Sequence, residues 1–241
     1  MPEYKARDAD SYGHAIGILM LEYRAPFIPG DVGNASSYDY PVLFKTVAGL
    51  SLDKALSGDP DQEEQVIDAA RELQRFGVRG VSSDCGFLIA YQDAVRKALD
   101  VPVFLSSLLQ VPLVAASVDG PIGVVVASSG GVNERVLELA GVRDPSRIVV
   151  CGMENQPHFT ESILEQGGTL DSDRIERETV DSVQRMVAAN PGMGAIVLEC
   201  SLLPPYSRAV QEATGLPVFD YITMIDYFQA GTHQQRYYGL Y

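Results

Sequence analysis

Two cysteines occupy the same place in two similar stretches of the sequence. Residues 76–104 and 191–219 align without a gap at a shift of 115 residues, and Cys85 falls on Cys200. The identical pairs are Gly77/Gly192, Cys85/Cys200, Leu88/Leu203, Tyr91/Tyr206, Ala94/Ala209, Val95/Val210, Ala98/Ala213, Pro102/Pro217, Val103/Val218 and Phe104/Phe219. Two thiols at matched positions suggest two acid/base groups that face one substrate. Such a pair can remove a proton from one face of a carbon and return one to the other face.

An acid precedes each cysteine, Asp84 in the first stretch and Glu199 in the second. Alternation along a strand predicts that these acids point away from the thiols, where they cap or form salt bridges. Helices are predicted to start soon after both cysteines, and the positive end of a helix dipole favours the thiolate. A third cysteine, Cys151, has no counterpart, and we assign it to the core. We therefore expect iodoacetamide to label Cys85 or Cys200 before Cys151.

The elements that position the cysteines follow from an alternation of β-branched runs and helical periods, which is typical of parallel α/β units. Strands are predicted at 14–21, 41–44, 78–83, 101–104, 121–127, 148–151, 194–198 and 216–219, and helices at 60–76, 93–99, 173–189 and 206–214. Both cysteines then follow the carboxyl end of a strand, where open α/β sheets bind ligands.

The duplication extends to the first strand of each half, because Ile16-Gly17 is matched by Ile122-Gly123. We therefore predict two similar parallel-sheet α/β lobes related by a pseudo-two-fold axis, with the active site in the cleft between them. Residues 1–105 plus 220–241 are assigned to the first lobe and residues 106–219 to the second. The segment 22–40 is rich in Pro, Gly and Asn, and we interpret it as a loop over the site.

Composition restricts the partners of the protein. The net charge of −14 over 241 residues argues against binding to nucleic acid or to an anionic membrane surface. We expect a cytoplasmic protein with free thiols, because the start of the sequence is polar, no apolar run has the ~18 residues of a membrane span, and the cysteine count is odd. A homodimer is compatible with these features.

No cofactor is expected. None of the lysines lies beside a phosphate-cradling glycine loop, which argues against a pyridoxal Schiff base. The histidines, His14, His158 and His233, have no metal-ligand spacing with one another or with the cysteines, so no metal is predicted.

A duplicated α/β unit with one cysteine after the same strand in each half resembles the aspartate/glutamate racemase superfamily. That group includes aspartate, glutamate and hydantoin racemases, maleate isomerase and arylmalonate decarboxylase, and the likeness runs from the Ile16 strand to the Phe219 strand. The amino-acid racemases carry Cys-Asn-Thr and Gly-Cys-Thr, whereas this chain has Cys85-Gly86 and Cys200-Ser201. The first context therefore disfavours an α-amino-acid substrate. Because both thiols are present, the resemblance to arylmalonate decarboxylase, which has one, is weaker.

The resemblance implies a cofactor-independent racemase or epimerase that acts at a carbon α to a carboxylate or amide carbonyl, with Cys85 and Cys200 as proton carriers. The substrate is expected to be small and either anionic or amide-containing. The resemblance also implies that loop amides and hydroxyls hold the substrate, at Gly86, Ser128, Ser129 and Ser201. It places Arg24 as a charge partner, although a solvated arginine explains that residue equally well.

Two other functions remain open at this point. A maleate-type cis–trans isomerase would use one cysteine as a nucleophile, and the cysteine pair alone does not separate it from a racemase. A two-lobed binding protein would have kept the fold without turnover. Solvent-deuterium uptake separates the three, because a racemase exchanges the α-hydrogen, addition to an alkene need not, and a binding protein does nothing.

Overall fold

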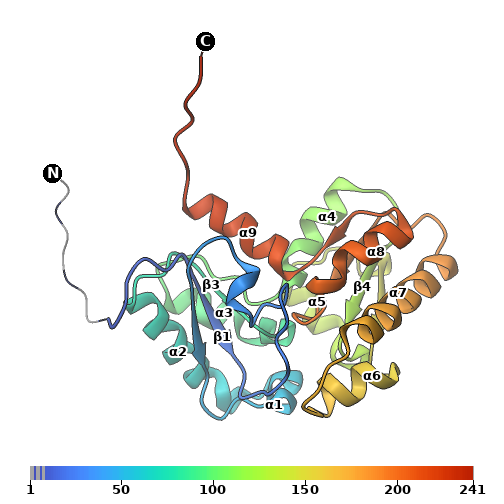
Figure 1. Ribbon diagram of the computed structural model, residues 1–241, viewed down its shortest axis with the longest axis horizontal. Helices are drawn as coiled ribbons and strands as arrows, with labels where there is room; N and C mark the ends of the chain where they lie inside the picture. Colours follow the sequence, from blue (N-terminus) through green and yellow to red (C-terminus); the bar gives the residue numbers. More distant parts are fainter. Residues whose placement is uncertain (1–2, 4–5, 7–8, 241) are drawn as a thin grey trace.

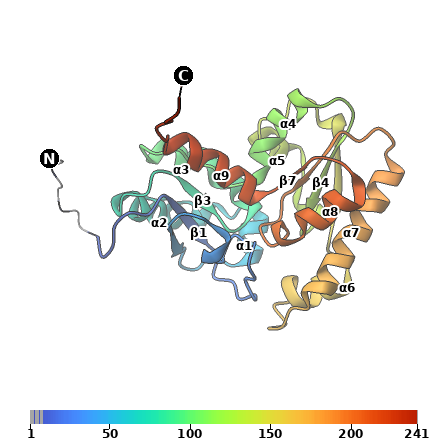
Figure 2. The ribbon, with the colours of Figure 1, turned by 45° about the horizontal axis from the view of Figure 1, so that its top comes forward.

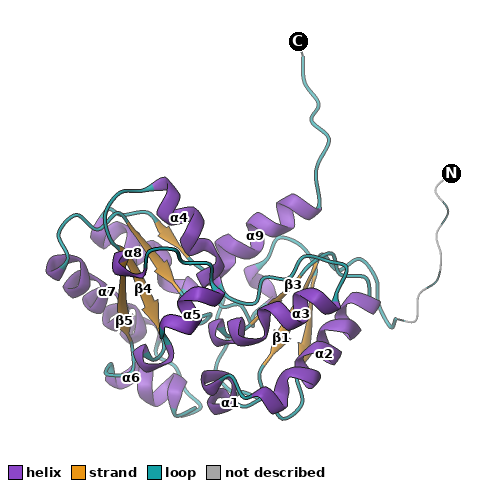
Figure 3. Ribbon diagram, turned by 180° about the vertical axis from the view of Figure 1, so that it is seen from behind, coloured by secondary structure: helices purple, strands orange, loops and turns teal. Residues whose placement is uncertain are grey.

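Two parallel sheets form the framework of the computed structural model, which describes residues 3, 6 and 9–240. The first sheet has the strand order β2-β1-β3 and the second has β5-β4-β6-β7. The strands are β1 (Ile16–Met20), β2 (Val42–Thr46), β3 (Val81–Ser83), β4 (Ile122–Val126), β5 (Ile148–Gly152), β6 (Ala195–Leu198) and β7 (Val218–Phe219). Figure 3 shows the two groups of strands side by side with helices around each. Residues 1 and 241, the outer ends of the predicted first lobe, lie outside the described residues.

The pairing of the strands repeats between the lobes. In the first lobe Val81 of β3 forms a parallel bridge with Val103, and in the second Ile196 of β6 pairs with Val218 of β7. These pairs correspond at the same shift of 115 residues that aligns the cysteines. The predicted strand at 101–104 is thus reduced to the single bridge at Val103. The predicted class, two similar parallel α/β lobes, is confirmed.

The central strands are apolar on both faces because helices cover both faces. All five residues of β1 and all five of β4 are buried. The shared Ile-Gly step has a packing reason, since a Cβ at Gly17 would lie 2.9 Å from Leu73 Cδ1 and one at Gly123 would lie 2.4 Å from Met186 Cε. Each glycine thus lets the long helix of its lobe approach the sheet.

The helices that the sequence predicts are present with small shifts in their ends. For example, a single helix is predicted at 60–76, and the structure has a 3-10 turn at Pro60–Gln62 followed by α2. The described helices are α1 (Leu52–Ser57), α2 (Glu63–Arg75), α3 (Gln92–Ala98), α4 (Val111–Ser117), α5 (Glu134–Leu139), α6 (Pro157–Phe159), α7 (Ser172–Ala189), α8 (Ser207–Thr214) and α9 (Tyr221–Thr232). No helix in the described part of the chain has the length and apolar character needed to cross a membrane.

Helix α9 returns the chain to the first sheet after the second is complete (Figures 1 and 2). Its Phe228 ring stacks on Phe104 with 4.2 Å between ring centroids. Tyr221 and Ile225 join the buried cluster that contains Ile16. Asp220 starts the helix with a capping box to Thr223. This helix was not predicted from the sequence.

The segment 22–40 is a loop, as predicted, with one short 3-10 turn at Ala35–Ser37. The loop starts in the first lobe and contacts the second. Val32 N–H donates to the carbonyl of Ser201 at 3.3 Å, and a Cβ at Gly30 would lie 3.0 Å from Pro205 Cα. The loop therefore connects the first sheet to the chain that follows Cys200.

Candidate active site

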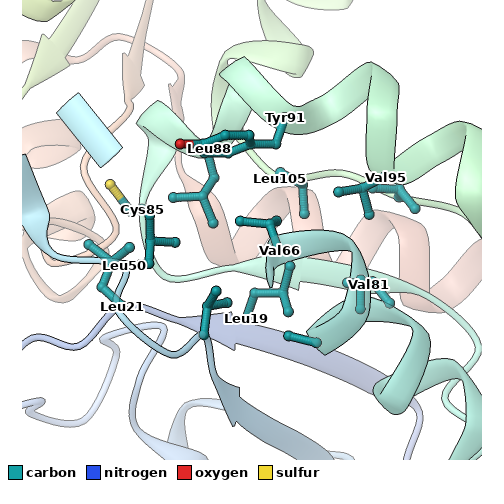
Figure 4. Packing of buried hydrophobic residues seen from close by; sticks show 14 of the residues in the cluster. Leu19, Leu21, Leu50, Val66, Val81, Cys85, Leu88, Tyr91, Val95 and Leu105 are labelled. Atoms are coloured by element: carbon teal, nitrogen blue, oxygen red, sulfur yellow. The ribbon is translucent and has the colours of Figure 1, made fainter. Parts of the chain in front are cut away.

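Both repeat cysteines lie just beyond a strand end and line one cavity between the two sheets. Cys85 follows β3 and Cys200 follows β6, and the carboxyl ends of the strands converge there. Figure 4 shows the Cys85 sulfur at the edge of the apolar cluster that includes Leu21 and Leu50. The cavity volume is about 30 Å³, room for about two water molecules. A larger substrate requires part of the wall to move.

The thiols are free and almost completely buried, with Cys85 7% and Cys200 6% exposed. Burial raises the pKa of both thiols, and the nearby Glu199 carboxyl raises each pKa further. The amides of Phe87 and Leu202 act in the opposite direction, since they lower the pKa of Cys85 and Cys200 respectively. The expected lowering of the thiol pKa by a helix start is therefore wrong for this closed form, because burial outweighs the amides.

The order of reactivity expected from the sequence also changes. Cys151 lies on β5, outside the cavity, and is more exposed than either repeat cysteine. Burial raises its pKa as well, but Arg185 partly offsets that effect. We therefore expect iodoacetamide to reach Cys151 first while the cavity stays closed.

The two acids beside the cysteines line the same cavity as the thiols. Alternation predicted the opposite, but it holds only within a strand. β3 ends at Ser83 and β6 at Leu198, so Asp84 and Glu199 already belong to the turns. Burial raises the pKa of Asp84 to about 7 and that of Glu199 to about 8.

These matched acids have different partners. Both oxygens of Asp84 accept the backbone N–H of Leu21, at 3.1 and 3.2 Å, so Asp84 ties its own turn to the end of β1. Glu199 is 1% exposed, and its Oε1 has no hydrogen-bond partner among the described residues. The predicted capping role thus fits Asp84 but not Glu199.

A third buried carboxyl, Asp31, lies in the loop at 22–40 and was not identified from the sequence. It is 2% exposed, and its Oδ1 accepts the N–H of Gly33 at 2.7 Å. Burial raises its pKa to about 8, and the carboxyl in turn raises the pKa of Cys200. None of the described residues that line the cavity is a lysine, arginine or histidine. The site is therefore rich in carboxyls and thiols and has no basic side chain.

The predicted substrate contacts are only partly brought together. Gly86 and Ser201 line the cavity, and the Ser201 hydroxyl donates to the backbone carbonyl of Asp84, which links the lobes. Ser128 and Ser129 are not part of the lining, although their neighbour Ala127 is. The Ser129 hydroxyl instead donates to Glu154.

Arg24, the predicted charge partner, is exposed and does not line the cavity. Its backbone N–H donates to Gln166 Oε1 at 3.0 Å. The residue before it, Tyr23, does line the cavity, and its hydroxyl donates to the carbonyl of Ile163 at 2.5 Å. Ile163 belongs to a π-helical turn, Thr160–Leu164, in the second lobe. These two bonds close the wall between the loop and that turn.

Metal binding finds no support in the described residues, where no three His, Cys, Asp or Glu side chains are grouped to hold an ion. The cavity lining thus offers two thiols, two carboxyls, backbone amides and apolar walls. These groups are suited to proton transfer at a carbon next to a carboxylate.

Comparisons with known proteins show relatives of this chain. The chain is 33% identical over 235 residues to "Dimethylsulfoniopropionate lyase" of Durusdinium sp. clade D, covering 94% of this chain and 77% of that protein. It is 34% identical over 240 residues to "Dimethylsulfoniopropionate lyase 7" of Emiliania huxleyi, covering 94% of this chain and 69% of that protein.

Solved structures share the fold. A cysteine mutant of arylmalonate decarboxylase matches with a TM-score of 0.63 at 21% identity, covering 92% of this chain and 96% of that chain. Glutamate racemase RacE1 of Bacillus anthracis matches with a TM-score of 0.56 at 14% identity, covering 87% of this chain and 77% of that chain. The family model "Asp/Glu/Hydantoin racemase" matches residues 42–225, and the chain belongs to that family.

Proposed function

We propose that this protein is a lyase that cleaves dimethylsulfoniopropionate into dimethyl sulfide and acrylate. The observation that carries the proposal is the lining of the cavity, in which two thiols and two carboxyls meet apolar walls without a basic side chain. The relatives at 33% and 34% identity bear the name of this activity. A lyase replaces the isomerase expected from the superfamily resemblance.

The substrate carries a sulfonium cation at one end and a carboxylate at the other. Its methyl groups suit the apolar walls, which include Leu21, Leu52 and Phe87. Its carboxylate requires donors, and the turns after the cysteines carry backbone amides at the cavity, at Gly86 and Ser201 among others. A glutamate or aspartate substrate would bring a second carboxylate beside Asp84 and Glu199, which is unfavourable.

In the reaction, one cysteine thiolate takes a proton from the carbon next to the carboxylate. The electron pair of the broken C–H bond forms the C=C bond of acrylate, and the C–S bond electrons leave with dimethyl sulfide. The proton on the thiol then passes to solvent, which restores the base. Such a base typically contributes about 10²–10⁴-fold, and amides that stabilise charge on the carboxylate contribute further.

The raised thiol pKa is compatible with this role. In the closed form, burial and the carboxyls around Cys85 and Cys200 disfavour the thiolate. A bound sulfonium adds a positive charge at the site, which lowers the pKa of a nearby thiol. The cationic end of the substrate thus favours the thiolate, whereas a substrate without a cation would not.

Racemisation is the second candidate, because both cysteines line the same cavity. A racemase needs an acid and a base on opposite faces of the carbon, whereas an elimination needs one base. The names of the relatives favour the elimination.

The test is headspace gas chromatography of the purified protein with dimethylsulfoniopropionate, with acrylate measured by NMR. We expect equal amounts of both products, and no release from the matched Cys85→Ser/Cys200→Ser double variant. Absence of dimethyl sulfide from the unmodified protein, together with α-hydrogen exchange in aspartate, a hydantoin or a hydroxy acid, would replace the lyase by a racemase.

A further inference from the structure

We propose that the carboxylate of Glu199 binds the cationic end of the substrate and makes the site selective for a cation that has no N–H donors, such as a sulfonium. This inference rests on the proposed function, since it assigns a residue to the charged group of that substrate. Nothing in the relatives' names assigns a role to this residue.

Glu199 differs from the neighbouring buried carboxyls, Asp84 and Asp31, in its hydrogen bonds. Asp84 accepts the amide of Leu21, which joins two segments distant in the sequence, and Asp31 accepts the amide of Gly33 within its own loop. Glu199 Oε1 is buried and has no partner in the described part of the chain. A buried acceptor without a partner is destabilising, which points to a role for Glu199 Oε1 other than support of the fold.

The side chain of Glu199 extends from the second lobe to the first. A Cβ at Gly86 would lie 1.8 Å from Glu199 Oε1, so the carboxylate rests against the turn that carries Cys85. Glutamate has one methylene more than its repeat counterpart Asp84, and this extra length gives it that reach. The absence of a side chain at Gly86 leaves room for the carboxylate beside the thiol.

The surroundings select the chemical class of the cation. Much of the wall consists of apolar side chains, among them Leu52, Phe87 and Ile163, which offer no acceptors to the N–H groups of a primary ammonium. A sulfonium or quaternary ammonium has no donors to satisfy, and aromatic faces attract such cations. The one strong requirement that remains is an opposite charge, which Glu199 supplies.

The protonation state of Glu199 fits this role. Burial raises its pKa to about 8 in the closed form, so near neutral pH the carboxyl is mostly protonated until a cation binds. The bound cation favours the charged form and displaces that proton. A neutral analogue of the same shape displaces nothing and leaves the carboxyl as it is.

The experiment compares two inhibitors of the same shape, 3-(trimethylammonio)propanoate, which carries a cation, and 4,4-dimethylpentanoate, in which carbon replaces nitrogen. Dissociation constants are measured by isothermal titration calorimetry, which requires no turnover. We expect the unmodified protein to bind the cationic analogue about tenfold or more tightly, an effect that corresponds to one charge pair in a partly desolvated site. Equal affinity for the two analogues in the unmodified protein would overturn the proposal without any variant.

Variants assign the preference to one side chain. Glu199→Gln keeps the shape and should reduce the cation preference to about threefold or less, whereas Glu138→Gln, at an exposed position of α5, should keep it. Glu199→Asp keeps the charge but shortens the reach, and we expect an intermediate preference. A preference that survives in Glu199→Gln would assign the cation to another group and contradict the proposal.

The outcome is separable from that of the proposed function. A Glu199-dependent cation preference in a protein that releases no dimethyl sulfide would support the cation site and reject the reaction. If the protein releases dimethyl sulfide but prefers the cationic analogue equally with and without Glu199, the reaction is supported and the cation site is rejected.

Discussion

The two halves of the site share a backbone and differ in their side chains. Cys85 and Cys200 follow matched strands, and the amides of Phe87 and Leu202 act on the two sulfurs in the same way. The acid before the thiol, by contrast, accepts the Leu21 N–H in the first half, whereas in the second half Glu199 Oε1 has no hydrogen-bond partner among the described residues. The duplicated fold thus places two thiols symmetrically, while the substitutions around them make the cavity asymmetric.

A second difference lies at the last residue of the strand before each thiol. In the first half, Ser83 Oγ donates to the carbonyl of Leu105 at 2.6 Å, and the Tyr221 hydroxyl donates to the same carbonyl at 2.7 Å. The second half has Leu198 at the position of Ser83, and no hydroxyl there. Helix α9 corresponds at the same shift of 115 residues to the 3-10 turn Ser107–Gln110 and α4, and the position of Tyr221 is occupied there by Ser106, which has no ring. A symmetric site suits a racemase, which treats both faces alike, and these differences favour a reaction with one direction.

The largest expected effect concerns the thiols themselves. If one cysteine is the base of an elimination, Cys85→Ser and Cys200→Ser should reduce kcat/KM unequally, one by about 10³-fold or more and the other by about tenfold. Serine keeps the size of the side chain but has a much higher pKa. The measurement is the rate of dimethyl sulfide release for each variant. Equal and severe losses would restore the two-base mechanism and remove the asymmetry from the chemistry.

The next effect is on stability and depends on pH. The pKa of Glu199 is raised in the folded protein to about 8, so folding favours its neutral form. The stability that this gives is present below the unfolded pKa of about 4.3 and is lost as the pH rises toward 8. Glutamine does not titrate, so Glu199→Gln does not lose this stability as the pH rises. The free energy of unfolding of the variant, minus that of the unmodified protein, should therefore increase between pH 5 and pH 8 by on the order of 2 kcal/mol.

Urea unfolding at both pH values measures this change, and Glu138→Gln is the exposed control. A difference between Glu199→Gln and the unmodified protein that stays constant with pH would mean that Glu199 is not a buried titrating group.

Asp84 corresponds to Glu199 in the first half, and its removal should destabilise the fold. Asp84→Ala leaves the Leu21 N–H buried without its acceptor, which should lower the free energy of unfolding by about 1–3 kcal/mol. Asp84→Asn keeps an oxygen acceptor and should lose less than half as much. Thermal unfolding near pH 6 measures both variants. If Asp84→Ala is as stable as the unmodified protein, the cap is not the role of this acid.

Much of this site was predictable, and the limits have a physical cause. The repeat located Cys85 and Cys200 and the strands before them, because strand periodicity and residue identity are local signals. The directions of Asp84 and Glu199 were wrong although both predicted strand ends, Ser83 and Leu198, are correct, because alternation was applied to the first residue of the turn beyond each strand. The backbone of a turn is set by its own contacts, and strand periodicity does not describe it.

The remaining groups of the site depend on contacts between distant parts of the chain. Tyr23 reaches the cavity because it bonds to Ile163, 140 residues away. Asp31 is buried because its loop folds against the segment after Cys200. Helix α9 has an apolar composition and few polar positions, so no clear periodicity marked it. Arg24 was predicted as a contact because of its charge, but the preceding residue, Tyr23, lines the cavity instead.

The smallest expected effect concerns the closure of the wall between the halves. Tyr23→Phe removes the hydrogen bond to Ile163, which contributes about 1 kcal/mol, so the open form should become about fivefold more populated. The rate at which iodoacetamide labels Cys85 and Cys200 should rise by that factor, while the rate for Cys151 stays unchanged. Mass spectrometry of peptides after timed exposure gives all three rates. An unchanged rate at both repeat cysteines would show that the wall opens elsewhere.

The most direct test of the account is to follow dimethylsulfoniopropionate in D₂O by proton NMR with the unmodified protein. If the asymmetric site performs an elimination, the vinyl signals of acrylate and the signal of dimethyl sulfide should grow together as the substrate disappears. Accumulation of α-deuterated substrate without either product would contradict the account, because it would show that the site exchanges a proton at the carbon while the C–S bond stays intact.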